Sequence, residues 1–122
     1  MAISITEPTS NSTVPSAFAA KGTFTAGAGG GNIQITVYES NGTTQLPNTT
    51  VFPAGVMVPP GTGSGNWSVS VSRIGAYNGA IIKATLVPYG GGTPDDALVT
   101  GINITSGGGT SESDSGGVGQ AL

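Results

Sequence analysis

Cysteine and histidine are both absent from this sequence of 122 residues. Their absence excludes disulfide bonds, thiol nucleophiles, zinc sites of the usual Cys/His kind and acid–base catalysis by imidazole. Only three side chains are basic and six are acidic. Three cations are too few for the positive surface that nucleic-acid phosphates require. The longest apolar run, Ala17–Ala20, is far too short for a membrane-spanning helix. We therefore expect no nucleic-acid partner and no membrane insertion.

Glycine is abundant instead, at 22 positions. The glycine-rich stretches match neither phosphate-binding pattern, G-x-x-x-x-G-K-[ST] or G-x-G-x-x-G, so we interpret them as turns and linkers. No serine lies in a G-x-S-x-G context or has a histidine partner, which argues against an enzyme. The one carboxylate pair, Asp95 and Asp96, lacks the alternating oxygen ligands of a calcium loop, so we expect it to begin a strand from a solvated turn. The sequence predicts no catalytic residue, no metal and no cofactor.

Apolar residues recur at every second position in several segments, and no segment shows the 3.6-residue period of a helix. Clusters of Gly, Pro and Asn separate these segments. The alternating segments are 3–6, 18–24, 33–38, 67–72 and 98–104. Short strands at this spacing predict an all-β fold, an Ig-like antiparallel β-sandwich of about seven strands over residues 1–105.

Three segments carry more specific expectations. Segment 80–87 is apolar on both faces, which predicts a central strand. Asn41-Gly42 is a hairpin signal, because both residues tolerate the positive φ of a type I′ turn. In the last alternating segment, Leu98, Ile102 and Ile104 are predicted to share one face.

Segment 46–60 is unusual because it combines four prolines with apolar side chains. The prolines remove backbone donors, so the segment cannot be a central strand. It is either an edge strand and loop that fold over the open end of the sandwich, or an exposed apolar patch that docks on a partner. The apolar side chains in question are Val51, Phe52, Val56, Met57 and Val58.

The Gly/Ser-rich tail, residues 106–122, has the composition of a linker. Its only large apolar side chains are Val118 and Leu122. Pairing at a sheet edge needs few side chains, because backbone hydrogen bonds supply the affinity. We therefore expect the tail to act as an assembly or attachment segment, with Val118 and Leu122 at the partner interface.

Aromatic residues give only a weak carbohydrate signal. Trp67 begins an alternating strand and is predicted to pack in the core. Tyr38 shares the polar face of its strand and Tyr89 lies at a strand end, so these two offer a weak glycan contact.

Two stretches resemble the Ig-like domains of bacteria and phages. One is Ile3-Ser4-Ile5-Thr6-Glu7-Pro8 with the later Lys21-Gly22-Thr23-Phe24-Thr25; the other is Gly65-Asn66-Trp67-Ser68-Val69-Ser70-Val71 followed by Gly75-Ala76-Tyr77. The resemblance covers residues 3–105 and departs from the family pattern where 78–80 separates Tyr77 from the next strand. It implies a non-enzymatic module of adhesins, surface proteins, polysaccharide-active enzymes or phage virions.

The sequence begins without a basic and apolar export signal, which favours a protein made in a cytoplasm. Combined with the resemblance, this predicts a phage capsid decoration protein, made in the host cytoplasm and bound to the capsid surface. Its expected partners are the major capsid protein or copies of itself. One alternative is an exported bacterial surface or filament subunit, such as an adhesin domain, joined to its neighbours by strand exchange. A second alternative is a carbohydrate-binding module.

Overall fold

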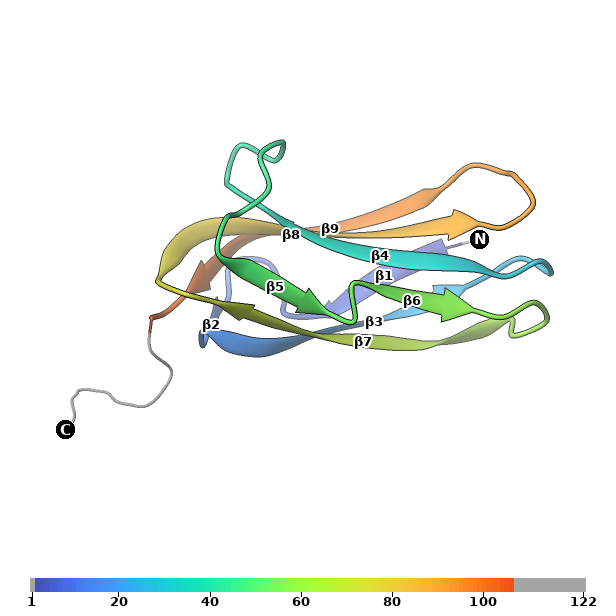
Figure 1. Cartoon of the computed structure of the whole chain (residues 1–122), viewed down its shortest axis with the longest axis horizontal. Coiled ribbons are helices and arrows are strands. Elements are labelled where there is room, and N and C mark those ends of the chain that lie inside the picture. The colour runs from blue at the N-terminus through green and yellow to red at the C-terminus, as the bar shows by residue number, and fades with distance from the viewer. Residues whose placement is uncertain (1, 107–122) are drawn as a thin grey trace.

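The computed structural model of the chain describes residues 2–106 and forms two β-sheets packed face to face (Figure 1). The four-stranded sheet has the spatial order β1 (Ala2–Glu7), β3 (Ala17–Thr25), β7 (Ser64–Arg73) and β5 (Thr49–Phe52). The five-stranded sheet has the order β2 (Thr13–Val14), β9 (Asp95–Ile104), β8 (Tyr77–Pro88), β4 (Gly31–Tyr38) and β6 (Gly55–Val58). All pairs are antiparallel except β2 with β9. The predicted all-β sandwich is confirmed, with nine strands rather than seven in this part of the chain.

The additional strands come from short segments. Segment 46–60 contains two of them, because the chain leaves β5 at Pro53 and crosses from one sheet to the other before β6 begins. Both are edge strands, which confirms that the proline-rich segment is not central. The predicted central strand at 80–87 is also confirmed, because β8 lies between β9 and β4.

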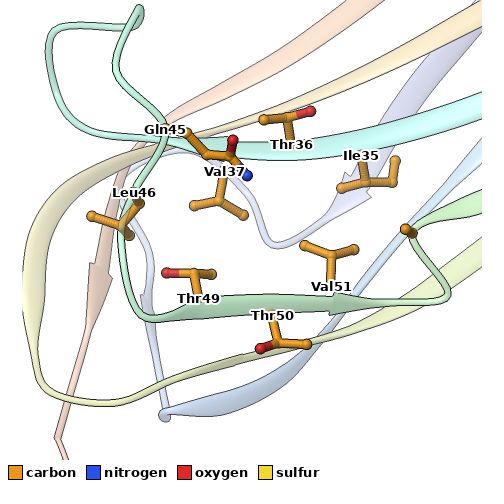
Figure 2. Close-up of a pocket in the computed structure, with 9 residues that line it drawn as sticks. Ile35, Thr36, Val37, Gln45, Leu46, Thr49, Thr50 and Val51 are labelled. Atoms are coloured by element: carbon orange, nitrogen blue, oxygen red, sulfur yellow. The ribbon is translucent and has the colours of Figure 1, made fainter.

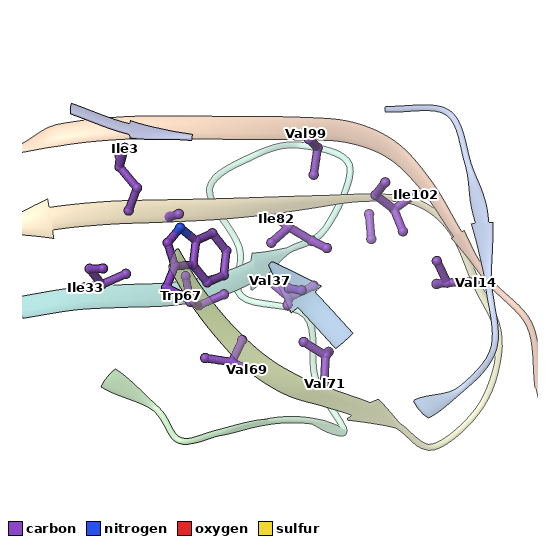
Figure 3. Close-up of a cluster of buried hydrophobic side chains, with 14 of the residues drawn as sticks. Ile3, Val14, Ile33, Val37, Trp67, Val69, Val71, Ile82, Val99 and Ile102 are labelled. Carbon is purple, nitrogen blue, oxygen red and sulfur yellow. The ribbon is translucent and has the colours of Figure 1, made fainter. Parts of the chain in front are cut away.

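The core fills the space between the sheets with one side chain from every second position of each long strand (Figure 3). Ile33, Ile82 and Ile102 are fully buried, and Trp67 is 3% exposed, as its place in an alternating strand predicted. Phe24 from β3 is also buried, on the inner face that the alternation indicates.

Gly22 and Trp67 are register partners on β3 and β7, and the indole ring lies against the glycine. A Cβ atom at position 22 would lie 2.6 Å from the indole and would collide with the carbonyl oxygen of Ser4. Because the glycine has no side chain, the indole Nε1 reaches past β3 and donates a hydrogen bond of 3.1 Å to that carbonyl on β1. One side chain therefore links three strands of the sheet.

The hairpin predicted at Asn41-Gly42 is confirmed by an antiparallel bridge between Tyr38 and Gln45, but its predicted turn type is wrong. The chain turns through 39–45, where the Glu39 N–H donates to the Thr44 carbonyl and only Gly42 takes a positive φ. The Asn41 side chain accepts hydrogen bonds from the N–H groups of residues 43 and 44, which favours a wider loop over a two-residue turn. The antiparallel pairing with β4 ends at Leu46, and the following strand, β5, joins the other sheet.

The predicted shared face of Leu98, Ile102 and Ile104 is also wrong. The pairing between β8 and β9 shifts register between Tyr77 and Ile82. Between Val99 and Ile102, β9 has one residue more than β8 has between Ile82 and Ala80. This β-bulge includes Gly101, whose φ is 68°. The side chains therefore change face at that point: Leu98 is 58% exposed, whereas Ile102 and Ile104 are buried. The shift coincides with segment 78–80, where the sequence departs from the Ig-like pattern.

The outer face of the four-stranded sheet is covered mainly by small hydroxyl side chains. Every outward position of β7 carries Ser or Asn, and β3 alternates its buried residues with outward Ala, Lys or Thr. Some of these hydroxyls bond to one another across strands, as Ser4 and Thr23 do at 2.6 Å. The face is therefore polar with little charge.

Candidate functional site, an open groove between β4 and β5

The two sides of the sandwich are closed differently. On the β1 and β2 side, the Ile3 N–H donates to the Asp95 carboxylate at 2.9 Å, which joins the edges of the two sheets. Further along β9, the Asn11 N–H donates to the Thr100 carbonyl, and the Asn103 N–H donates to the Ser12 carbonyl. The N-terminal segment therefore binds this edge of the sandwich over most of its length.

The opposite side is only partly covered. Strand β6 pairs with β4 from Gly31 to Gln34 and stops there. The chain contacts the edge of β4 again where the Leu46 N–H donates to the Val37 carbonyl, at 2.9 Å. That bond shows that the odd-numbered residues of β4 direct their backbone groups away from β8. Ile35 lies between the two contacts, and within residues 2–106 no strand lies beside it.

Strand β5 presents a second free edge to the same space. The Ile74 N–H donates to the Asn48 carbonyl at 3.0 Å, which fixes the alternation of the pairing between β5 and β7. Even-numbered residues of β5 therefore bond to β7, and the backbone groups of Thr49 and Val51 point to the free edge. The four-stranded sheet ends there in the described part of the chain.

A groove of about 280 Å³ lies between these two edges (Figure 2). Val51 and Thr49 of β5 point toward Val37 of β4 across it, and the buried Leu46 closes one end. The remaining lining residues are Ile35, Thr36, Gln45, Thr50 and Ala54. A strand added along β5 would therefore place every second side chain into a groove lined by both apolar and polar groups.

The structure distributes the five interface residues predicted in segment 46–60 over different surfaces. Val51 lines the groove, and Val56 is half-buried on β6. Phe52 and Met57 are 75% and 71% exposed, but they lie on the outer faces of different sheets and do not form one patch. Val58 faces the core at 2% exposure, so its side chain is not available to a partner. The other two predicted residues, Val118 and Leu122, lie outside the described residues.

Sequence reasoning missed the lining residues of β4 and of the loop before β5. Ile35 and Val37 were interpreted only as the buried positions of an alternating strand. Alternation identifies the inner face of a strand but not whether its edge has a neighbour. The proline-rich composition after Leu46 was the one signal that the neighbouring strands are short.

A second hollow, of about 370 Å³, adjoins the groove and shares Thr49 and Thr50 with it. Arg73 lines this hollow and donates through Nη1 to the carbonyl oxygens of residues 74, 75 and 76. Its guanidinium lies 5.5 Å from the centre of the Tyr77 ring, and its Nε is buried without a hydrogen-bond partner. No carboxylate of residues 2–106 forms a salt bridge with it, so the groove has a cation at one end.

The other carboxylates considered in the sequence lie at the start of β9. Within residues 2–106, no three Asp or Glu side chains gather as metal ligands would. Asp95 and Asp96 begin β9, as predicted; the first accepts the bond from β1, and the second lies 3.8 Å from Lys83. In the same range, no helix is long and apolar enough to cross a membrane.

The two tyrosines considered for glycan contact do not form a shared stacking surface. Tyr38 ends β4, whereas Tyr89 follows β8 beside the start of β4, where its N–H donates to the Gly30 carbonyl. They therefore lie at opposite ends of the five-stranded sheet.

Comparison with known proteins gives similarity at the level of structure alone. No protein-family model matches the chain, and no curated protein sequence matches it significantly. Among solved structures, the periplasmic chaperone SfaE superposes with a TM-score of 0.62 and 7% identity, covering 87% of this chain. The E. coli chaperone DraB gives 0.61 with 9% identity over 86%, and the class 5 fimbriae chaperone CfaA gives 0.55 with 13% identity over 86%.

The chain spans 56–58% of the length of these three chaperones. At such low identity the similarity establishes the fold, which is an Ig-like β-sandwich. All three are chaperones, one described as periplasmic and one as fimbrial, and none of the three is described as a virion protein. The prediction of a phage capsid decoration protein is therefore wrong, as are its major capsid protein partner and its place on the capsid surface.

Proposed function

We propose that the chain is a non-enzymatic, Ig-like module of an exported bacterial surface or filament assembly. In this proposal it binds a protein partner by strand addition at the β5 edge. The observation that carries the proposal is the groove between β4 and β5, which combines unpaired backbone groups with a lining of aliphatic and hydroxyl side chains.

The chemistry of the groove favours an extended peptide over a small molecule. The N–H and C=O groups of Thr49 and Val51 face the free edge, so a strand beside them would form main-chain hydrogen bonds. Side chains at alternate positions would contact Ile35, Val37 and Leu46. The nearby charges are few, so shape and backbone pairing would determine the choice of partner.

The exported location is supported by the similar solved structures. The three similar structures are chaperones, two of them described as periplasmic or fimbrial. One of these chaperones is described as periplasmic, and we extend a location outside the cytoplasm to this chain.

Fractionation of the native source tests the location. We expect an antibody against residues 2–106 to detect the chain in the periplasmic or surface fractions, within complexes larger than the monomer. Recovery only as a cytoplasmic monomer, or with DNA-filled particles, would overturn the proposal.

A proline substitution tests the binding edge. Val51→Pro removes an N–H that faces the free edge, so it blocks strand addition and leaves the bonds to β7 intact. We expect this variant to be lost from the large complexes, whereas Val51→Ala stays in them. Retention of Val51→Pro in the complexes would show that β5 is not the binding edge.

A further inference from the structure

We propose that the chain's own C-terminal segment, Val118–Leu122, adds to the free edge of β5 as a strand and covers the groove. A partner strand would then have to displace it, and this second step rests on the proposed function. Occupation of the groove by the segment does not.

The sequence of the segment matches the groove. In a strand, Val118, Gln120 and Leu122 lie on one face, and Gly119 and Ala121 lie on the other. The first face places the only large apolar side chains of the tail toward the aliphatic part of a mixed lining, which includes Val37 and Val51. The second face is small, which suits the outer surface beside Thr50.

The end of β9 lies close enough to the groove for residues 107–117 to bridge the distance. Ile104 of β9 pairs with Tyr77, and Thr49 of β5 pairs with Arg73, so both strands reach the same end of the sandwich at the turn between β7 and β8 (Figure 1). The path crosses two strand spacings and one sheet spacing, about 20 Å in total. Residues 107–117 span up to about 36 Å when extended, and a Gly/Ser-rich chain of that length has a root-mean-square reach of roughly 17–20 Å.

Charge favours the same path. Glu112 and Asp114 are the only charged residues of the tail, and both precede Val118. Arg73 lies at the end of the groove that faces the end of β9, and within residues 2–106 it has no acidic partner. A tail that runs from Ser106 to β5 therefore brings its two carboxylates past the unpaired guanidinium before its apolar residues reach the groove.

The same chain supplies the segment more readily than a second copy. A short flexible connection holds the segment at an effective concentration in the millimolar range. At micromolar protein concentration, a second copy competes at a disadvantage of about a thousandfold.

Disulfide trapping in the full chain tests this arrangement, because the native sequence has no cysteine to interfere. Thr50 and Ala121 would both point outward from neighbouring strands, so we combine Thr50→Cys with Ala121→Cys. The matched control combines Thr6→Cys with Ala121→Cys; Thr6 is exposed on β1, the other edge strand of the same sheet. Both proteins are oxidised with oxidised glutathione at about 1 µM, where the intramolecular reaction dominates.

We expect the Thr50 pair to form a disulfide within the monomer at least about tenfold faster than the control, as non-reducing gels and peptide mass spectrometry measure. Adding Arg73→Gln to the Thr50 pair should slow trapping, and the effect should shrink at high salt. Equal rates for the Thr50 and Thr6 pairs would overturn the inference, as would a disulfide-linked dimer as the main product. If the Thr50 pair fails to form a disulfide while Val51→Pro is still lost from the native complexes, only this inference is overturned. If the disulfide forms normally but the chain is found in no such complexes, only the proposed function is overturned.

Discussion

The two sides of this sandwich show two ways of ending a β-sheet. On the β1 and β2 side, hydrogen bonds between residues about ninety positions apart join the N-terminal segment to β9. On the β5 and β6 side, each edge strand has four residues and the two are joined through Pro53. On the first side, hydrogen bonds join the two sheets, whereas the second side retains a free edge over a groove.

The closed side contributes mainly to the stability of the domain, and the open side offers a free strand edge for binding. The closed side links elements that are distant in sequence, so its loss should loosen the whole domain. The open side contributes less to the core and keeps its backbone groups for another strand. Substitutions on the two sides should therefore change the free energy of unfolding by different amounts.

The largest effect is expected for Gly22→Ala, on the closed side. The new Cβ collides with the Ser4 carbonyl and the indole of Trp67, so the bond that links β1 to β7 is lost together with local packing. We expect a loss of about 3 kcal/mol in the free energy of unfolding, and a Tm lower by roughly 12–20 °C. Thermal unfolding followed by circular dichroism measures it. Ala19→Ser, on the exposed face of the same strand, is the control; a similar small shift for both would contradict the role of the glycine.

Proline at adjacent positions of β5 should separate its two edges. Thr50→Pro removes an N–H that bonds to β7 and should cost about 2 kcal/mol. Val51→Pro removes an N–H at the free edge and should cost less than about 1 kcal/mol. Urea unfolding of both variants provides the comparison. The alternation assigned to β5 would be wrong if Val51→Pro proved the more damaging substitution.

Val71 and Val51 are register partners, which allows the same truncation to be made in the core and in the groove. Val71 is 1% exposed, so Val71→Ala should destabilise the domain by about 2 kcal/mol. Val51 borders an open space, so Val51→Ala should cost less than about 1 kcal/mol. Equal losses in urea unfolding would indicate that the groove is closed in solution.

The smallest effects concern two adjacent carboxylates. Asp95→Ala removes the acceptor that holds the Ile3 N–H and should cost about 1 kcal/mol. Asp96→Ala removes a partly exposed ion pair with Lys83 and should cost no more than about 0.5 kcal/mol. Adding 1 M NaCl should leave the first difference in place and abolish the second, as measured by urea unfolding.

Local patterns predicted most of the fold because side-chain alternation is a local property. The alternation at 67–72 placed Trp67 in the core, and the two apolar faces of 80–87 placed that strand at the centre of a sheet. Leu98 was assigned to the wrong face because the bulge at Gly101 depends on the pairing with β8. A bulge changes the alternation without any change in the composition of the strand.

The groove could not be predicted in the same way. Its lining comes from β4, β5 and the loop between them, and it is open only because β6 ends opposite Gln34. The resemblance on which the functional prediction rests is shared by bacterial surface proteins and phage proteins, so it does not distinguish the two. A sandwich pattern specifies a fold, and that fold serves many partners.

The hydroxyl-covered face of the four-stranded sheet has a consequence for solution behaviour. Serine and threonine hydroxyls form hydrogen bonds with water whatever the acidity or the ionic strength. A surface hydrated by carboxylates and ammonium groups changes with both, because its charges titrate and are screened. We therefore expect the hydration of this face to change little with pH or with salt concentration.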